Sequence, residues 1–397
     1  MNILMITPFF PYPAEFGGTI RTYHLAKELA KNNDLFLLSF KDRENIQPEK
    51  VKEFCKNVEI VPLLEDSKRI VQLQTLFKKK SYQTQQYASE AMQNAINATI
   101  KANNIDLVFI EFSQMGFFDI PKDIPVLLDE HNIEFDLLDR MSEKDSFSFR
   151  KLYNKIEAIK FEKEEISFIS KSAITITTSQ RDINIIKKYL PDARTAEIIN
   201  GVDCVEFAKP DDITPEKNSA VFTGAMNYFP NDEGVNFFME EIYPLIKKKD
   251  PNFKITIVGN GPSEKIKAYK NENINITGFV KDVKPYMWNS SVFIVPLRMG
   301  GGTRFKVVEA MAAGIPVVST SLGCEGIPGK DGEHLLIRDD PADFADAVFE
   351  AATNQELAQR LRENGIKFAK ENVDWEIVGN KLNNEIINAV KEFNNEK

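Results

Sequence analysis

One stretch of the chain combines glycines and cations in the way that a diphosphate site requires. Its residues are, in order, Met299, Gly300, Gly301, Gly302, Thr303, Arg304, Phe305 and Lys306. An apolar run precedes the stretch, and an alanine-rich, helix-like segment follows it. Strand, glycine loop and helix make an anion pocket, because N–H groups at a helix start point outward and the helix dipole favours negative charge there. Glycines let the backbone approach a ligand, and Arg304 and Lys306 add positive charge.

The competing interpretation is an ordinary surface loop. In that case Arg304 and Lys306 are solvated, and Lys306 pairs with Glu309 one helical turn on. The residues after the loop favour the first interpretation, because they resemble the donor site of retaining glycosyltransferases of the GT-B type, family 4. That family has a glutamate followed by Ala-Met-Ala-x-Gly-x-Pro-Val-Val, and the same string runs here from Glu309 to Val318.

The resemblance implies a role for each residue of the stretch in binding a nucleoside-diphosphate sugar. Arg304 and Lys306 would stabilise the leaving diphosphate and are the predicted catalytic cations. Glu309 would accept hydrogen bonds from the ribose hydroxyls. The donor-binding residues implied here are Gly301, Gly302, Thr303, Arg304, Lys306 and Glu309.

One position departs from the family pattern, which is Glu-x7-Glu. With Glu309 as the second glutamate, the first falls on Gly301. The family's first glutamate contacts hydroxyls of the donor sugar, so the identity of the sugar stays open. A subgroup with Gly-Gly-Thr-Arg-x-Lys before the glutamate looks like a workable variant. The chain also has no Asp-x-Asp pair, so we expect no bound metal and no cofactor, with protein cations in the place of a metal.

A second glycine loop lies near the start of the chain. Gly17 and Gly18 follow a strand-like run and precede a helical pattern from Ile20 to Lys31, with Arg21 in its first turn. An ordinary connection between strand and helix is the alternative. In the family this loop covers the donor phosphates and faces the acceptor, which implies that Gly17 and Gly18 contact the donor and that Arg21 lies on the acceptor side.

Polar residues follow two neighbouring strand-like runs. Glu111 and Gln114 follow the run 106–110, and His131 and Asn132 follow the run 125–129. Ligands of doubly wound sheets bind at the carboxyl ends of strands, and a histidine there, between acidic and amide neighbours, is a candidate for chemistry. A structural histidine is the alternative. In the resemblance, a histidine here contacts the donor sugar, and we place Glu111, Gln114 and Asn132 on the acceptor side.

The second half of the chain adds two observations on the donor. The loop after the run 220–224 lacks the arginine and lysine that many family members carry, which gives Arg304 and Lys306 more weight. A Gly-x-Gly at 259–261 has Glu264 where a dinucleotide fingerprint has its third glycine, which disfavours a dehydrogenase. Phe279 and Val280 stand where the family holds the nucleotide base, with core packing as the equal alternative.

Strand-like and helix-like segments alternate over the whole chain, which predicts an α/β protein. The resemblance specifies the GT-B fold, with two Rossmann-like, doubly wound domains facing each other across a cleft. We expect domains at 1–200 and 201–374, and a helix at 375–397 that crosses back to the first domain. The amphipathic segment 136–171 is predicted to be a single packed helix. The predicted strands of the first domain are 2–8, 35–40, 58–62, 106–110, 125–129, 173–178 and 196–199.

Composition excludes several classes of protein. The chain has 397 residues and a formal net charge of −9, which disfavours nucleic acid as a partner, and no apolar run approaches bilayer length. Its start has no basic region typical of a signal peptide, and its three scattered cysteines suit the cytoplasm. Lys78 to Lys80, beside Phe77 and Tyr82, could contact the inner face of a membrane peripherally; a solvated charge run is the alternative.

These observations predict a metal-independent glycosyltransferase of the hexosyltransferase type, and the resemblance implies that it retains the anomeric configuration. It would move a sugar from a nucleotide-diphosphate donor to a glycan or lipid-linked acceptor in polysaccharide or cell-surface glycan synthesis. Same-face attack, with the leaving phosphate taking the acceptor proton, needs no protein nucleophile, and His131 would shape the reaction centre. The alternatives are a nucleotide-sugar 2-epimerase, which Glu111, Asp129 and Glu130 would serve, and a catalytically silent nucleotide-sugar binding protein, which Gly301 suggests.

Overall fold

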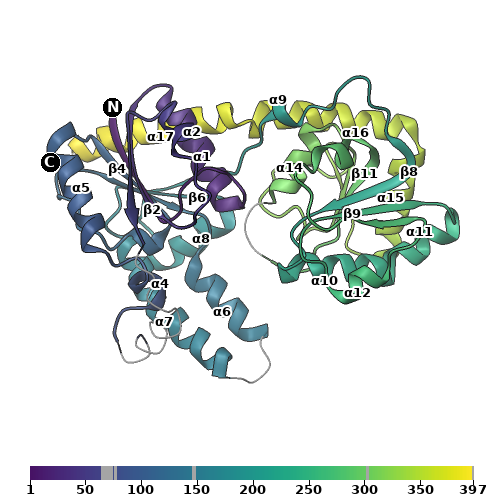
Figure 1. Ribbon diagram of the computed structural model, residues 1–397, viewed down its shortest axis with the longest axis horizontal. Helices are drawn as coiled ribbons and strands as arrows, with labels where there is room; N and C mark the ends of the chain where they lie inside the picture. The colour runs from purple at the N-terminus through teal and green to yellow at the C-terminus, as the bar shows by residue number, and fades with distance from the viewer. Residues whose placement is uncertain (64–74, 76–77, 145–148, 301–303, 396–397) are drawn as a thin grey trace. The chain divides into compact units, whose positions relative to one another are not determined.

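The chain divides into two compact units, each built on its own sheet (Figure 1). The computed structural model describes residues 1–63, 75, 78–144, 149–300 and 304–395. Unit 1 comprises Met1–Ile199 and Val378–Lys397, and unit 2 comprises Asn200–Ile377. Of the predicted donor loop, Gly301, Gly302 and Thr303 lie outside the described residues.

The sheet of unit 1 has seven parallel strands in the order β3-β2-β1-β4-β5-β6-β7. Its central strands are mostly apolar, because helices cover a doubly wound sheet on both faces and leave no face for water. All five residues of β4 are buried, for example. The strands are β1 (Asn2–Thr7), β2 (Asp34–Lys41), β3 (Asn57–Pro62), β4 (Leu107–Glu111), β5 (Val126–Glu130), β6 (Ile174–Thr177) and β7 (Thr195–Glu197).

The strand order reverses at β1, which has β2 on one side and β4 on the other. Right-handed crossovers therefore place the helices of the two halves on opposite faces of the sheet. Such a reversal is where doubly wound sheets bind ligands. The helices of unit 1 are α1 (Gly17–Ala30), α2 (Pro48–Lys52), α4 (Tyr82–Gln85), α5 (Glu90–Asn103), the 3-10 turn η1 (Ser113–Met115), α6 (Glu134–Lys144), α7 (Phe149–Ile169) and α8 (Gln180–Tyr189).

The prediction of one long helix over 136–171 is wrong. The structure has two helices there, α6 and α7, which pack against each other (Figure 1). Residues 145–148, between the two helices, lie outside the described residues. The apolar stripe read as the face of one helix is thus shared by two helices.

Unit 2 repeats the architecture with six parallel strands in the order β10-β9-β8-β11-β12-β13. Here the order reverses at β8, which pairs with β9 on one side and β11 on the other. Two doubly wound α/β sheets were predicted, and both are confirmed. The strands are β8 (Glu216–Thr223), β9 (Lys254–Val258), β10 (Ile274–Ile276), β11 (Ser290–Val295), β12 (Val317–Ser319) and β13 (Leu336–Ile337).

Helix α14 (Phe305–Ala312) follows β11 and carries the predicted donor-binding side chains. Four of its eight residues are alanine or valine, and the helix ends before Gly314, whose φ of 66° is costly for any residue with a Cβ. The other helices are α9 (Cys204–Phe207), α10 (Phe229–Phe237), the π-helical turn η2 (Phe238–Ile242), α11 (Tyr243–Lys249), α12 (Glu264–Ala268), α13 (Lys284–Trp288), α15 (Pro341–Thr353), α16 (Gln355–Phe368), the π-helical turn η3 (Ala369–Val373) and α17 (Trp375–Asn395).

The last helix, α17, begins in unit 2, and its residues from Val378 onward belong to unit 1. Gly379 lies against helix α1, where a Cβ would come 2.3 Å from that of Glu28. Within the described residues, no helix has the length and apolar character that crossing a membrane would need.

Candidate active site

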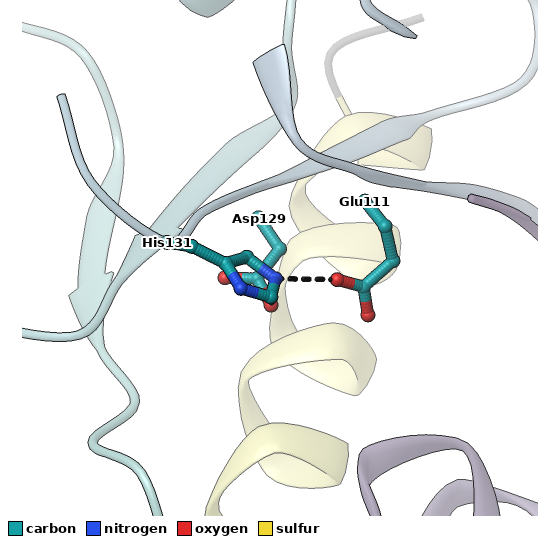
Figure 2. A group of neighbouring side chains, drawn as sticks. All are labelled: Glu111, Asp129 and His131. Carbon is teal, nitrogen blue, oxygen red and sulfur yellow. Dashed lines mark hydrogen bonds and ion pairs between the residues drawn. The ribbon is translucent and has the colours of Figure 1, made fainter. Parts of the chain in front are cut away.

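His131 follows β5 directly and is held by a buried carboxylate. Its Nε2 lies 2.7 Å from Oε2 of Glu111, the last residue of β4 (Figure 2). His131 is 8% exposed and Glu111 is fully buried. The strand register explains the pairing, because Glu111 lies opposite Asp129 and His131 follows two residues later. The hydroxyl of Thr178 also donates to the His131 carbonyl at 3.2 Å.

Asp129 lies beside this pair and is neutralised by Arg21 of helix α1. The Arg21 guanidinium donates to both Asp129 oxygens, from Nε at 2.7 Å and from Nη2 at 2.9 Å. Arg21 is fully buried, and its Nη1 also donates to the Ile198 carbonyl at 2.8 Å. Burial, and next the charge of Asp129, raises the pKa of Glu111, which His131 and Arg21 oppose. Arg21 thus fixes Asp129, and its role toward an acceptor stays a prediction.

Phe112 supports the other side of the histidine. Its ring stacks on the His131 imidazole with centroids 3.8 Å apart and an angle of 21° between the planes. The backbone of Phe112 has a φ of 66°, a conformation that a residue with a side chain adopts at a cost of about 1–3 kcal/mol. A Cβ on Gly18 would lie 2.8 Å from Phe112 Cζ. The Phe112 ring therefore lies between Gly18 of the glycine loop and the imidazole of His131, close to both.

Glu111, Asp129 and His131 are also the residues that could hold a metal ion. Their ligand atoms lie within 4.8 Å of one another. However, both Asp129 oxygens accept hydrogen bonds from Arg21, and Glu111 Oε2 contacts His131. A cation here would have to compete with the Arg21 guanidinium for Asp129. The group fits a hydrogen-bond network better than a metal site, and metal independence stays a prediction.

A second group of carboxyls fastens the segment after His131 to helix α7. Glu165 of α7 accepts the first N–H groups of α6, those of Glu134 and Phe135, at 3.0 Å each. Ser113 donates its hydroxyl to Glu165 at 2.8 Å. Burial raises the pKa of Glu165 to about 8 and of Glu134 to about 7. Burial, and next Glu165, raises the pKa of Glu130 well above its usual range.

The remaining predicted acceptor residues lie around this group. Gln114 is 8% exposed, and its amide opposes the rise in the pKa of Glu134. Asn132 is half-buried and directly follows His131. The structure therefore brings Glu111, Gln114, His131 and Asn132 to the same edge of the unit 1 sheet, as the rule for parallel strands predicts.

In unit 2, Lys306 reaches from the first turn of α14 to the loop after β8. Its Nζ donates to Asn231 Oδ1 at 2.9 Å and lies 4.1 Å from the centroid of the Phe222 ring. A Cβ on Gly224 would come 2.8 Å from this Nζ. Burial, and next the positive charge of Arg304, lowers the pKa of Lys306 to about 7. Lys306 brings a cation to a loop that has none at the family's usual position.

Arg304 and Glu309 lie at the start and in the middle of the same helix. Arg304 is the N-cap residue of α14 and is 7% exposed. Burial raises the pKa of Glu309 to about 7, although Lys306 opposes the shift. Among the ion pairs of the described residues, none joins Lys306 to Glu309, so the alternative of a simple surface pair is not what the structure shows.

The predicted base-binding residues have different environments. Phe279 is 74% exposed, which excludes core packing for its ring, and Val280 is half-buried. Two residues past Asn231 in α10, Glu233 pairs with Arg298, whose Nε donates to it at 3.0 Å.

Sequence reasoning missed three residues of these sites, namely Phe112, Glu165 and Asn231. The positive φ of Phe112 carries no sequence signal, because glycine and asparagine are the residues that such a conformation favours. Glu165 caps a helix that begins 31 residues earlier, and Asn231 lies 75 residues from Lys306. Such long-range partners follow from the fold and not from local pattern.

Comparison with known proteins finds a family that the second unit resembles. The model of the family described as glycosyl transferases group 1 matches residues 217–354. An uncharacterised 44.6 kDa protein in the cps region of Klebsiella pneumoniae is 24% identical over 394 residues, covering 94% of this chain and 96% of that protein. Phosphatidyl-myo-inositol mannosyltransferase of Mycobacterium tuberculosis is 27% identical over 200 residues, which are 47% of this chain and 52% of that enzyme.

Solved structures resemble the whole chain. Sucrose-phosphate synthase of Thermosynechococcus elongatus has a TM-score of 0.70 at 14% identity and covers 98% of this chain and 99% of its own. HepE of Anabaena, in complex with UDP, has a TM-score of 0.69 at 13% identity and covers 98% of this chain and 100% of its own. At these identities the likeness concerns the fold, and it confirms the predicted GT-B architecture.

Proposed function

Since this chain is a glycosyltransferase of group 1 with the GT-B fold, we propose that it transfers a sugar with retention of configuration from a nucleoside-diphosphate donor. The acceptor would be a glycan or lipid-linked glycan of the cell surface. The observation that carries the proposal is the placement of Lys306, which α14 delivers to the loop after β8 together with Arg304 at the start of the helix.

Unit 2 would bind the donor. The Anabaena neighbour is described in complex with UDP and in complex with UDP-glucose, so a uracil nucleotide is the first candidate. Arg304 and Lys306 would contact the diphosphate, with Gly301, Gly302 and Thr303 completing the loop. Glu309 would accept hydrogen bonds from the ribose, and exposed Phe279, with Val280, would lie against the base.

The chemistry needs no protein nucleophile in this proposal. As the bond from the anomeric carbon to the phosphate oxygen breaks, negative charge grows on the diphosphate, and Arg304 and Lys306 stabilise it. The acceptor hydroxyl attacks from the same face and gives its proton to the leaving phosphate. His131, fixed by Glu111 and Phe112, orients the donor sugar. Gly17 and Gly18 would contact the donor phosphates.

Unit 1 would bind the acceptor, through Gln114, Asn132 and neighbouring backbone. The Klebsiella relative is named for a cps region, which supports a role in capsular or other surface polysaccharide synthesis. The mycobacterial relative is named for a phosphatidyl-inositol acceptor, which supports a lipid-linked one. We place the reaction at the inner face of the membrane, where the three free, buried cysteines would stay reduced.

Of the three carboxylates that the 2-epimerase alternative would use, Glu111, Asp129 and Glu130, two are already engaged. Epimerisation needs carboxylates that are free to act as acid and base. Glu111 and Asp129, however, are already bound to His131 and Arg21.

A thermal-shift panel of UDP, GDP, dTDP, ADP and CMP, with and without Mg²⁺, tests the proposal on wild type and Arg304→Ala. A ligand at a hundred times its dissociation constant stabilises by about 2.7 kcal/mol. We expect one nucleoside diphosphate to raise the melting temperature without Mg²⁺, and the variant to lose the shift. A protein that binds the nucleotide yet neither transfers nor hydrolyses the donor would be the silent binding protein. No shift with any nucleotide would overturn the proposed donor site.

A further inference from the structure

Unit 1 contains a cavity of about 1180 Å³ that the transfer chemistry does not use. Its walls are one face of β4 and β5, helices α4 and α7, and the connection 116–124. The volume exceeds that of sites for drug-sized ligands, which measure about 300–1,000 Å³. We call it the lysine-rimmed cavity, for the six lysines that line it: Lys79, Lys80, Lys122, Lys160, Lys163 and Lys171.

The inner wall of the lysine-rimmed cavity is apolar. Phe117, Ile124 and Phe168 line it and pack on the core of unit 1, yet each remains only partly buried. Ile159 of α7, also on the lining, is 51% exposed. Apolar side chains that cluster at a hollow and are exposed to solvent often mark a binding surface, whereas single exposed apolar residues do not.

The rim is positive and largely unneutralised. Two carboxylates, those of Asp119 and Glu164, face the six lysines, in a chain whose formal net charge is −9. Glu164 is already engaged, because its Oε2 accepts the hydroxyls of Ser81 at 2.5 Å and Thr84 at 2.6 Å. The carboxylate therefore joins α4 to α7.

The lysines themselves have few partners. Within the described part of the chain, Lys160 alone among the six forms an ion pair, at 3.5 Å from Glu157. Three lysines elsewhere in unit 1, Lys41, Lys50 and Lys52, each lie within 3.0 Å of a glutamate oxygen. Lys160 also donates to the Thr75 carbonyl, and Lys80 lies over the Phe117 ring, so the other four lysines are the ones best placed to meet an anion from outside the chain.

The lysines lie next to the apolar wall, which is the arrangement that an amphiphilic ligand requires. Ile159 and Lys163 are four residues apart on α7 and thus lie on one face of the helix. An ammonium is a compact point charge that suits a phosphate, and the stem of a lysine can lie along apolar surface. A free sugar phosphate would leave the aromatic wall unused, and an uncharged lipid would leave the lysines unused.

We propose that the lysine-rimmed cavity binds a phosphate-headed membrane lipid, with the phosphate among the rim lysines and the acyl or isoprenoid chain along Phe117, Ile124 and Phe168. The bound lipid anchors unit 1 at an anionic membrane surface. This goes beyond the transfer reaction, because the binding needs neither a sugar donor nor an acceptor sugar.

Vesicle flotation tests the proposal with the full chain. Vesicles of phosphatidylglycerol are compared with vesicles of phosphatidylcholine, for wild type and Lys163→Glu/Lys171→Glu. The matched control is Lys101→Glu/Lys188→Glu, which makes the same change of charge at exposed lysines of α5 and α8 in the same unit. Each basic residue beside an anionic leaflet contributes a factor of about five in binding. The rim variant should thus bind phosphatidylglycerol vesicles at least about twenty-five-fold more weakly than wild type. The control variant should lose much less binding.

The chain of the lipid is tested separately. Phe117→Trp places a reporter on the apolar wall, while the native tryptophans, Trp288 and Trp375, lie in unit 2. Phosphatidylglycerol with brominated chains should quench the new fluorescence. Dihexanoyl phosphatidic acid should displace vesicles from wild type, and glycerol 3-phosphate should not.

Four results would overturn the proposal: equal binding to phosphatidylcholine, equal loss in the control variant, no quenching of the reporter, or equal displacement by glycerol 3-phosphate. The nucleotide panel described above uses no lipid. The lipid proposal can therefore fail while the donor site stands, and the reverse is also true.

Discussion

Glu111 Oε2 lies 2.7 Å from His131 Nε2, in surroundings that leave the carboxylate fully buried (Figure 2). With Glu111 ionised, Nε2–H is the donor, and Nδ1 of the neutral ring becomes the acceptor left for a ligand. Stacking on Phe112 holds the plane of the ring. Glu111 therefore determines which nitrogen of His131 carries the proton, as carboxylates do for metal-bound histidines.

Glu111→Gln should lower turnover while leaving donor affinity unchanged. The amide keeps the shape of the side chain but removes the charge that favours Nε2–H, and hydrogen bonds to charged groups are worth about 1.5–3 kcal/mol. We expect kcat to fall about tenfold to a hundredfold, with the dissociation constant of the nucleotide within a factor of two. Steady-state kinetics and calorimetry measure the two quantities. Glu59→Gln, at an exposed carboxylate of β3, is the control, and an unchanged kcat in Glu111→Gln would remove Glu111 from the mechanism.

At Phe112, the glycine variant should be more stable than the alanine variant, which is the reverse of the usual order. Glycine is ordinarily less stable than alanine by about 0.5–1 kcal/mol, because it loses more backbone freedom on folding. At a φ of 66° the order should reverse, since alanine keeps the strain and glycine does not. We expect Phe112→Gly to melt at a higher temperature than Phe112→Ala in calorimetry.

Both Phe112 variants lose the ring beneath His131, so both should lower turnover. Phe112→Leu keeps an apolar side chain of similar size but cannot stack on the imidazole. Its turnover should lie between that of the two small variants and that of wild type. If Phe112→Ala melted above Phe112→Gly, the strained backbone would not be a property of the folded protein.

Donor binding should take up a proton at Lys306. Its pKa is lowered to about 7 by burial and by Arg304, so at pH 8 the free protein holds it mostly neutral. A diphosphate beside it favours the charged form and raises this pKa. Calorimetry of nucleotide binding at pH 8, in buffers with different ionisation enthalpies, should show uptake of up to about one proton.

The sign of the pH effect follows from this uptake. Affinity for the nucleoside diphosphate should fall as the pH rises from 7 to 9, because each binding event must then protonate a neutral lysine. Lys306→Met should bind more weakly and show no uptake, whereas Lys247→Met, at an exposed lysine of α11, should behave as wild type. Uptake that persisted in Lys306→Met would assign the proton to another group.

Much of this architecture could be predicted because the signals are local. Apolar runs bounded by loops located the strands, and the rule that carboxyl ends of parallel strands meet at one edge brought Glu111 and His131 together. The helix that carries Arg304, Lys306 and Glu309 was predicted from its glycine loop and alanine content. These features depend on a few neighbouring residues, and so a single sequence contains them.

The contacts that tune the site could not be predicted in the same way. Arg21 meets Asp129 across 108 residues of chain, and Lys306 meets Asn231 across 75. Which side chain reaches a site residue depends on the packing of the whole unit. The division of 136–171 into α6 and α7 was missed because an amphipathic stripe looks the same in one helix or in two.

Glu309 should make the stability of unit 2 fall as the pH rises. Its pKa is about 7 in the folded protein, against 4.5 ordinarily. Between these values the folded state holds a proton that the unfolded state has lost, so the free energy of unfolding decreases with pH in this window. The loss amounts to about 3 kcal/mol at most.

Glu309→Gln removes this dependence, because the amide does not ionise. Trp288 and Trp375 both lie in unit 2, and their fluorescence during urea unfolding at pH 5 and pH 8 reports its stability. We expect the variant to gain on wild type by about 2–3 kcal/mol between the two pH values. Glu350→Gln, at an exposed position of α15, should track wild type. A constant difference between Glu309→Gln and wild type would mean that Glu309 ionises in the folded protein as freely as it does in water, and the carboxylate would then be solvated rather than held ready for a ligand's hydroxyl groups.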